Sequence, residues 1–432
     1  MARQTSKQLR NKVMYSVFVR NHTAEGTFRA LCGDLDRIQS LGVDIIWLMP
    51  VHPIGKVSRK GTLGSPYAIS DYRAINPEYG TMEDFQNLVD DIHKRNMKCI
   101  IDVVYNHTSP DSVLSREHPE WFYRKPDGKF GNKVGEWWDV IDLDYNNPAL
   151  WDYQIETLKM WAGIVDGFRC DVAPMIPLEF WLRAREEVAA VRPDCLWLSE
   201  SVEPAFTIDN RARGMVSLSD SEIFQAFDLC YEYDIYSYFT GYLTGANSLE
   251  AYLDRVNMQE AIYPDNYVKL RFLENHDNAR AHFLIGDADK LRSWLAFCYF
   301  QKGMTLIYGG QEAGRRHLPS LFDRDTVNWE AEGVDLGDLM RSLYEIKKNP
   351  LLTDSRYTVK AMPGDVIVAT HTKGGKGLMG IFNVGGEAAL TLVPLAEGIY
   401  RNLIDGSEVE VHRGRIYAPE KPVIVAFEDA HP

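Results

Sequence analysis

The chain has 432 residues, of which 45% are hydrophobic and 12% aromatic, and its 47 basic and 61 acidic side chains give a formal net charge of −14. This acidic balance argues against nucleic acid or a membrane surface as a partner and favours an uncharged or cationic ligand. Residues 1–12 are polar, no apolar run is long enough to span a membrane, and the six cysteines are scattered. Together these features predict a cytoplasmic protein with reduced cysteines. The sequence does not indicate the oligomeric state.

Short apolar runs alternate with amphipathic stretches along the first 350 residues. One such stretch, residues 85–92, has helical spacing and follows a capping pair formed by Thr81 and Asp84. Eight strand–helix units over roughly 340 residues predict an α/β fold, a (β/α)₈ TIM barrel, although a doubly wound open sheet would alternate similarly. The predicted strands are residues 13–19, 43–49, 98–104, 165–171, 195–199, 224–229, 268–273 and 304–308.

Two segments break this alternation. Residues 106–147, after the third strand, are polar and aromatic without a helical stripe, and a loop of that length is usually functional. After Pro350 the chain changes to short β-like runs separated by glycines. We therefore expect a catalytic barrel over 1–105 and 148–349, a short inserted domain over 106–147, and a C-terminal antiparallel β-sandwich over 350–432.

Polar side chains gather where the predicted strands end. Barrel enzymes carry their active sites at the carboxyl ends of the strands, so these side chains are expected to converge on one mouth. They comprise acids, histidines and one arginine, namely Asp102, His107, Arg169, Asp171, Glu200, Glu274, His276 and Asp277.

A cluster of carboxylates complements positive charge that develops during a reaction, as in the oxocarbenium-like transition state of glycoside cleavage. Arg169 and Asp171 share one face of a strand, so the guanidinium should lower the pKa of Asp171 and favour it as the anion. Glu200 follows an apolar run and is the better candidate for a raised pKa. The residues alone do not rank Asp277 against Glu274 or Asp102 as the third acid.

Other interpretations of the same residues remain open at this point. An isolated Arg-x-Asp is as often a structural ion pair at a strand end as it is part of an active site. A metal-dependent lyase on the same barrel could use Asp102 and His107 instead.

The order of these motifs resembles the α-amylase family of retaining glycoside hydrolases over nearly the whole chain. Residues 102–107, 167–173, 198–200 and 275–277 are similar to its four conserved regions. Residues 42–50 and 142–146 are similar to auxiliary regions on either side of the inserted segment.

The resemblance implies a role for each matching residue. Asp171 would be the nucleophile that forms a covalent glycosyl-enzyme intermediate, Glu200 the general acid and then base, and Asp277 the acid that stabilises the transition state. The implied substrate is an α-glucan oligosaccharide. Its contacts would be Tyr67, His107, Arg169, His276 and Arg324.

Two departures from the family pattern limit what the resemblance implies. Pro174-Met175 replaces a Lys-His pair that is common in calcium-dependent members. Asn106 is similar to a calcium-ligand asparagine of the family, but residues 106–147 contain no clear acidic cluster. We expect that no cofactor is required, with calcium at Asn106 as the alternative.

The leading functional prediction is hydrolysis of α-1,4-linked glucose oligomers. A 4-α-glucanotransferase and an α-1,6-glucosidase would use the same three acids. A catalytically silent carbohydrate-binding protein is the alternative outside enzymology, and such proteins usually lack one of the acids.

Overall fold

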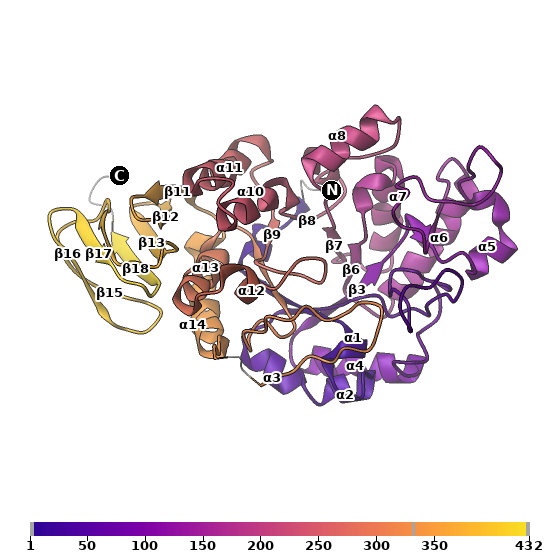
Figure 1. The fold of residues 1–432 in the computed structure, drawn as a ribbon, viewed down its shortest axis with the longest axis horizontal. Helices are drawn as coiled ribbons and strands as arrows, with labels where there is room; N and C mark the ends of the chain where they lie inside the picture. The colour runs from indigo at the N-terminus through magenta and orange to yellow at the C-terminus, as the bar shows by residue number, and fades with distance from the viewer. Residues whose placement is uncertain (1–3, 331–332, 429–432) are drawn as a thin grey trace.

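The computed structural model describes residues 4–330 and 333–428, and its centre is a closed barrel of eight parallel strands (Figure 1). Around the barrel the strand order is β1-β10-β9-β8-β7-β6-β3-β2, and β1 closes the ring because it pairs with both β2 and β10. The predicted (β/α)₈ barrel is confirmed. Its strands are β1 (Val13–Val17), β2 (Ile45–Leu48), β3 (Lys98–Val103), β6 (Gly167–Cys170), β7 (Leu196–Ser199), β8 (Leu229–Tyr231), β9 (Lys269–Arg271) and β10 (Met304–Tyr308).

Nearly all residues of the barrel strands are buried, which is why most of these strands read as apolar runs in the sequence. One predicted strand, residues 224–229, is wrong in its bounds. Phe224 ends a short helix, and its ring packs edge-on against Tyr263 and Tyr267, so this apolar run is core outside the barrel. The strand β8 begins only at Leu229.

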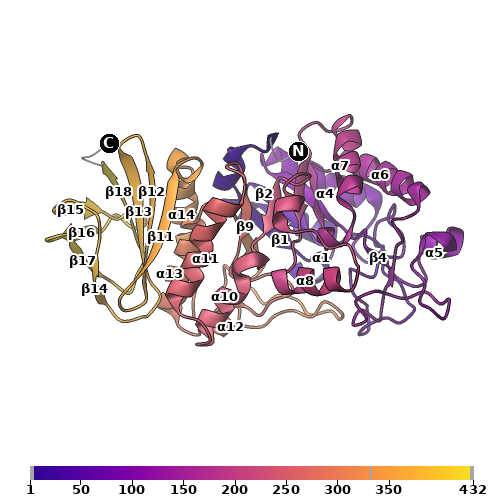
Figure 2. The same ribbon diagram turned by 90° about the horizontal axis from the view of Figure 1, so that it is seen from above.

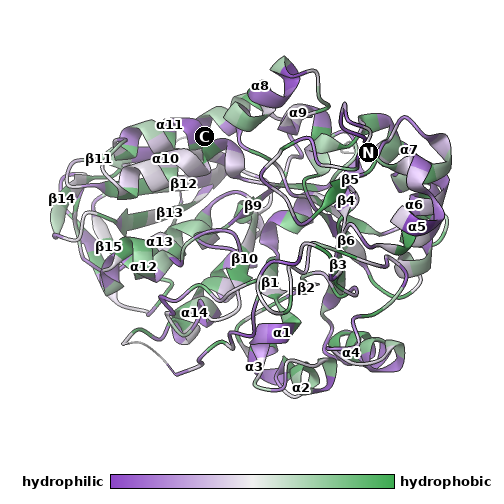
Figure 3. Cartoon of the chain, turned by 45° about the vertical axis from the view of Figure 1, so that its right-hand side comes forward, coloured by the Kyte–Doolittle hydropathy of each residue, from purple (hydrophilic) through white to green (hydrophobic). Residues whose placement is uncertain are grey.

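Helices cover the outside of the barrel, with their apolar residues toward the strands and polar residues outward (Figure 3). The predicted capping box is present, because Thr81 and Asp84 exchange side-chain and backbone hydrogen bonds at the start of α4 (Met82–Lys94). The other helices of the barrel are α1 (Val19–His22), α2 (Phe28–Cys32), α3 (Leu35–Ser40), α6 (Pro148–Ala162), α7 (Leu178–Ala189), α8 (Pro204–Ala212), α9 (Asp220–Ile223), α10 (Tyr233–Leu243), α11 (Leu249–Ile262), α12 (Ala281–Ile285), α13 (Ala288–Phe300) and α14 (Gly337–Lys347).

The segment between β3 and α6 leaves the barrel and returns to it. It contains α5 (Val113–Glu117) and a two-stranded pair formed by β4 (His107–Thr108) and β5 (Ile141–Asp142), in which His107 lies opposite Asp142. Trp121 and Phe122 are buried in it. Both belong to the same buried apolar cluster as the barrel, so the segment extends the barrel core to one side of the mouth.

The C-terminal part is built from antiparallel sheets, as predicted, and lies at the opposite end of the molecule from α5 (Figures 1 and 2). One sheet has the order β11-β12-β13-β18, and two pairs, β14–β17 and β15–β16, lie beyond it. The strands are β11 (Arg356–Met362), β12 (Val366–Lys373), β13 (Lys376–Asn383), β14 (Ala389–Leu392), β15 (Gly398–Arg401), β16 (Glu408–Val411), β17 (Arg415–Ala418) and β18 (Val423–Glu428).

The four-stranded sheet packs directly on helices of the barrel. The His371 Nε2 atom lies 2.9 Å from the carbonyl oxygen of Phe300 at the end of α13. The Asn257 side chain on α11 donates to the carbonyl of Val359 at 2.9 Å and accepts from its N–H at 3.1 Å. Apolar residues of the sheet, among them Leu378 and Phe382, belong to the same buried cluster as the barrel.

Among the helices of residues 4–330 and 333–428, none combines the length and the apolar character needed to cross a membrane.

Candidate active site

Arg169, at the end of β6, is the centre of a buried cluster at the carboxyl end of the barrel. Its Nη1 atom donates to Asp102 Oδ1 at 2.9 Å and to Asp171 Oδ1 at 2.9 Å. Its Nη2 atom lies 3.0 Å from Glu200 Oε2. Because Arg169 and Asp171 are two residues apart on a strand, both side chains point into the same mouth, as the sequence predicted. One guanidinium thus touches three carboxylates.

Asp102 is fully buried and both of its oxygens are engaged. Besides Arg169, it accepts a hydrogen bond from the Tyr67 hydroxyl at 3.1 Å. The same hydroxyl lies 2.6 Å from His276 Nε2, and the Tyr67 and His276 rings stack at 5.4 Å. This contact joins the loop after β2 to the loop after β9, so Tyr67 is held beside the acids by groups from two other strands.

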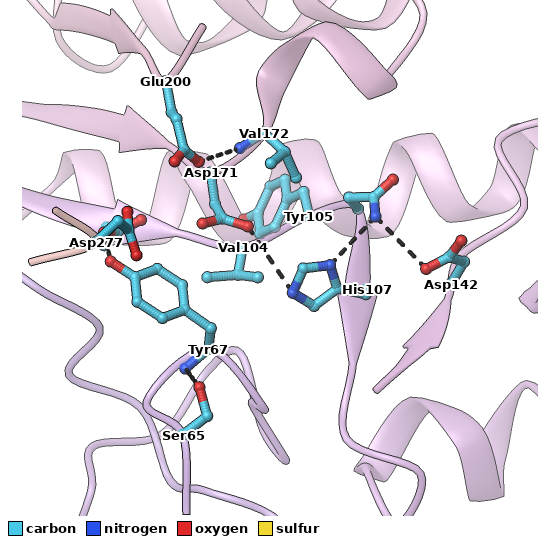
Figure 4. Close-up of polar contacts among 12 residues, drawn as sticks. Ser65, Tyr67, Val104, Tyr105, His107, Asp142, Asp171, Val172, Glu200 and Asp277 are labelled. Carbon is cyan, nitrogen blue, oxygen red and sulfur yellow. Dashed lines mark hydrogen bonds and ion pairs between the residues drawn. The ribbon is translucent and has the colours of Figure 1, made fainter. Parts of the chain in front are cut away.

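Glu200 follows β7, and one of its oxygens is held by a backbone donor and by an ion pair. The backbone N–H of Val172 donates to Glu200 Oε2 at 2.7 Å (Figure 4), and Arg169 Nη2 approaches the same oxygen. A carboxylic acid carries its proton on an oxygen that is not already accepting strong hydrogen bonds, so the proton of Glu200 belongs on Oε1.

The backbone at Val172 is strained to make this contact. Its φ of 35° and ψ of 42° lie in the left-handed region, which a β-branched residue rarely adopts. Strain of this kind persists where surrounding structure enforces it, commonly at functional sites. Here it turns the residue after Asp171 so that its N–H faces Glu200.

Burial sets the protonation of the cluster. It raises the pKa of Asp102 and of Asp171 to about 7 and that of Glu200 to about 8, while Arg169 acts in the opposite direction. Arg169 lowers the pKa of Asp171, as predicted, but one guanidinium shared by three carboxylates does not offset their desolvation, so the net pKa of Asp171 is raised. Glu200 has the highest value of the three and is the group that retains a proton at neutral pH.

Two neutral histidine side chains lie beside the acids at the mouth of the barrel. His107 Nε2 lies 3.8 Å from Asp171 Oδ2, on the other side of that carboxylate from Arg169. His276 Nε2 lies 3.1 Å from Asp277 Oδ2. Burial lowers the pKa of each histidine to about 4, so both are uncharged at neutral pH and can exchange hydrogen bonds with hydroxyl groups.

The structure separates the three candidates for the third acid. Glu274 is fully engaged, with Arg280 Nη1 at 2.5 Å and the N–H of Ala281 at 2.7 Å. Asp102 is buried and saturated. The Asp277 side chain is 43% exposed and contacts His276, so it is the carboxylate of the three that faces the open mouth.

Arg324 is not part of this cluster. Its side chain is exposed and donates to the carbonyl of Ala24 in the loop after β1. Sequence analysis in turn missed the Trp47 and Tyr231 rings, whose centroids lie 5.2 and 5.5 Å from the Arg169 guanidinium carbon. Each sits in an apolar strand, where an aromatic residue is ordinarily core, so no sequence signal distinguishes it.

Asn106 lies beside His107 and Asp142. Its Nδ2 atom lies 3.1 Å from His107 Nδ1 and 3.5 Å from Asp142 Oδ1, and the second oxygen of Asp142 accepts from the N–H of Lys133 at 2.7 Å. Within residues 4–330 and 333–428, no group of three or more His, Cys, Asp or Glu side chains is arranged to hold a metal. The Nδ2 atom of Asn106 and both oxygens of Asp142 are thus engaged in hydrogen bonds, and no step below uses a metal.

Two family models match the chain. "Alpha amylase, catalytic domain" covers residues 10–350, and "Bacterial Alpha amylase C-terminal domain" covers residues 358–425. A solved α-amylase from Lactobacillus plantarum superposes with a TM-score of 0.95 at 48% identity, over 98% of this chain and 100% of that one.

Curated relatives are more distant and mostly longer. Alpha-amylase 3 of Dictyoglomus thermophilum is 26% identical over 78% of this chain and 69% of its own length. A maltosyltransferase of Rhodospirillum rubrum, which uses α-1,4-glucan and maltose 1-phosphate by its name, is 32% identical over 76% of this chain. The chain spans only about half of that relative, 49%.

Proposed function

Because the chain belongs to the α-amylase family of glycoside hydrolases, we propose that it hydrolyses α-1,4-linked glucose oligomers with retention of configuration. The observation that carries the proposal is the placement of Asp171, Glu200 and Asp277 around one mouth, each on a different strand end. The acids are complete, which disfavours a silent carbohydrate-binding protein.

In the first step Asp171 attacks the anomeric carbon while Glu200 protonates the oxygen of the leaving sugar from Oε1. Arg169 holds Asp171 Oδ1 at 2.9 Å, which leaves Oδ2, on the His107 side, as the attacking oxygen. The positive charge of the oxocarbenium-like transition state is stabilised by the surrounding carboxylates, including Asp277.

In the second step water hydrolyses the covalent glycosyl-enzyme intermediate. Glu200, now ionised, removes a proton from the water that attacks the glycosyl ester of Asp171, and the ester bond to Asp171 breaks. Tyr67 supplies an aromatic face for the sugar at this position, while His107 and His276 offer neutral ring nitrogens to its hydroxyls.

A 4-α-glucanotransferase would follow the same first step and use a sugar hydroxyl in place of water. This second candidate is favoured by the similarity to a maltosyltransferase over three quarters of the chain, 76%. An α-1,6-glucosidase would differ in the linkage that it accepts.

The test is a time course on maltotriose and on panose, with products resolved by length. Maltose and glucose from maltotriose support the proposal, whereas products longer than maltotriose assign a transferase and cleavage of panose at its α-1,6 bond assigns the third activity. Asp171→Asn should abolish turnover, and a variant of wild-type rate would exclude Asp171 as the nucleophile.

A further inference from the structure

The side chain of Asp277 has less support than the other two acids of the mechanism. Arg169 contacts both Asp171 and Glu200. Within residues 4–330 and 333–428, the Asp277 carboxylate has one polar contact, His276 Nε2 at 3.1 Å, and the side chain is 43% exposed. The position of this acid must therefore depend on the backbone that carries it.

A buried asparagine side chain fixes that backbone. The Oδ1 atom of Asn275 accepts from the N–H of Asp277 at 3.0 Å and from Asn278 Nδ2 at 2.7 Å, and Asn275 is fully buried. Because a backbone N–H can only donate, the oxygen of Asn275 must face Asp277, and its amide protons must point the other way. The orientation of Asp277 thus depends on the group that accepts these protons.

The group that accepts them is the hydroxyl of Tyr233. Its oxygen accepts from Asn275 Nδ2 at 2.8 Å and from Asn278 Nδ2 at 3.1 Å. Burial raises the pKa of Tyr233 well above its usual value, and the charges of Asp277 and Glu200 raise it further. The hydroxyl therefore stays neutral, and it lies near two of the three acids.

Tyr233 is itself held rigidly. It is the first residue of α10, directly after β8, a strand that supplies none of the three acids. The rings of Tyr231, Tyr236 and Phe272 pack edge to face against it, with 5.3, 5.9 and 5.7 Å between the centroids. The preceding residue, Glu232, accepts from the N–H of Phe272 at 2.8 Å and so ties the start of α10 to the end of β9. A side chain locked by packing in this way can fix the position of a functional group.

We propose that Tyr233 is a positioning residue for Asp277: its hydroxyl holds the amide of Asn275, and the oxygen of that amide holds the N–H of Asp277. In this role Tyr233 does not touch the reacting atoms. The inference rests on the proposed function and deepens it, because it gives the third acid a support comparable to the one that Arg169 gives Asp171.

The first experiment removes the hydroxyl oxygen and keeps the ring. Misplacement of a catalytic group by about 1 Å costs on the order of 10²-fold, so Tyr233→Phe should lower kcat on maltotriose by about 10- to 100-fold. Because Asp277 acts on the transition state, the KM should change by less than about 2-fold. Tyr236→Phe is the matched control, since its hydroxyl lies in the same aromatic cluster but donates to the carbonyl of Leu273 at 3.2 Å. It should lower the melting temperature and leave kcat unchanged.

A double-mutant cycle tests whether the hydroxyl acts through Asp277. The substrate is α-maltosyl fluoride, whose good leaving group keeps slow variants measurable. Added to Asp277→Asn, Tyr233→Phe should lower kcat by less than about 2-fold further, because members of one hydrogen-bond network are not additive. Asn278→Ala, which removes one of the two donors, should show the same dependence on Asp277 with a smaller loss. Losses that multiply in full, or a wild-type kcat for Tyr233→Phe, would overturn the inference.

The positioning can also be tested without turnover. If the wild-type enzyme uses neither maltotriose nor α-maltosyl fluoride, the proposed function fails, and crystal structures of the variants decide the role of Tyr233. The Asp277 carboxylate should be displaced in Tyr233→Phe and remain in place in Tyr236→Phe. An unmoved Asp277 in Tyr233→Phe would overturn the inference.

Discussion

Replacing Glu200 by glutamine removes a proton and little else. The amide oxygen of the substituted side chain can still accept from the N–H of Val172, which holds Oε2 at 2.7 Å in the wild type, so the side chain keeps its place. What disappears is the acid on the other oxygen. General acid catalysis contributes about 10²–10⁴-fold, and Glu200→Gln should lose that factor on maltotriose, about 3–5 kcal/mol in activation free energy.

The leaving group separates this role from simple damage to the site. Fluoride needs no proton to depart, so Glu200→Gln should still form the glycosyl-enzyme from α-maltosyl fluoride. Azide, which attacks without a general base, should then release it as α-maltosyl azide, identified by proton NMR. Turnover of maltotriose at the wild-type rate, or an equal loss on the fluoride in the presence of azide, would refute the assignment of the proton to Glu200.

Three further predictions concern pH, metal and stability. The kcat/KM profile on maltotriose should fall below pH about 7, as Asp171 takes up a proton, and above pH about 8, as Glu200 loses one. Glu200→Gln should lack the fall at alkaline pH. A flat profile from pH 5 to 9 would contradict the raised pKa values of Asp171 and Glu200. Treatment with EDTA and buffer exchange should leave the rate on maltotriose unchanged, because both oxygens of Asp142 already accept hydrogen bonds, and restoration of a lost rate by calcium would disprove this. Lys347 donates to the carbonyls of Tyr299 and Gly303 at 2.9 Å, and burial lowers its pKa from 10.5 to about 7. Between pH 7 and 10 the Lys347 amine is protonated in the unfolded chain but largely neutral in the folded one. The free energy of unfolding should therefore rise by up to about 4 kcal/mol over this range through this group, and urea titrations of Lys347→Met should show that slope reduced.

The barrel could be predicted because its signals are local. Most of the strands are buried, largely apolar runs, and pairs such as Thr81 with Asp84 mark helix starts within four residues. The strand before Leu229 was misplaced because Phe224 is buried outside the barrel, and an apolar run does not reveal which core it joins.

The site could be predicted only as far as strand ends determine it. The positions of Asp171 and Glu200 follow from the strands that carry them. The choice of Asp277 over Glu274 could not be predicted, because it depends on Arg280, which occupies the Glu274 carboxylate together with the N–H of Ala281. The raised pKa of Asp171 depends on burial by the whole fold.

The contact between the C-terminal sheet and the barrel bears on how the chain can be shortened. His371 is wedged against the end of α13, and Asn257 on α11 completes the backbone hydrogen bonds of Val359. Cutting the chain after Pro350 would expose the faces of α11 and α13 that the sheet covers and strip Asn257 of its partners. The sheet acts as part of the barrel's outer wall, so heating should melt both in a single calorimetric transition, and the catalytic part should not be separable as an active fragment.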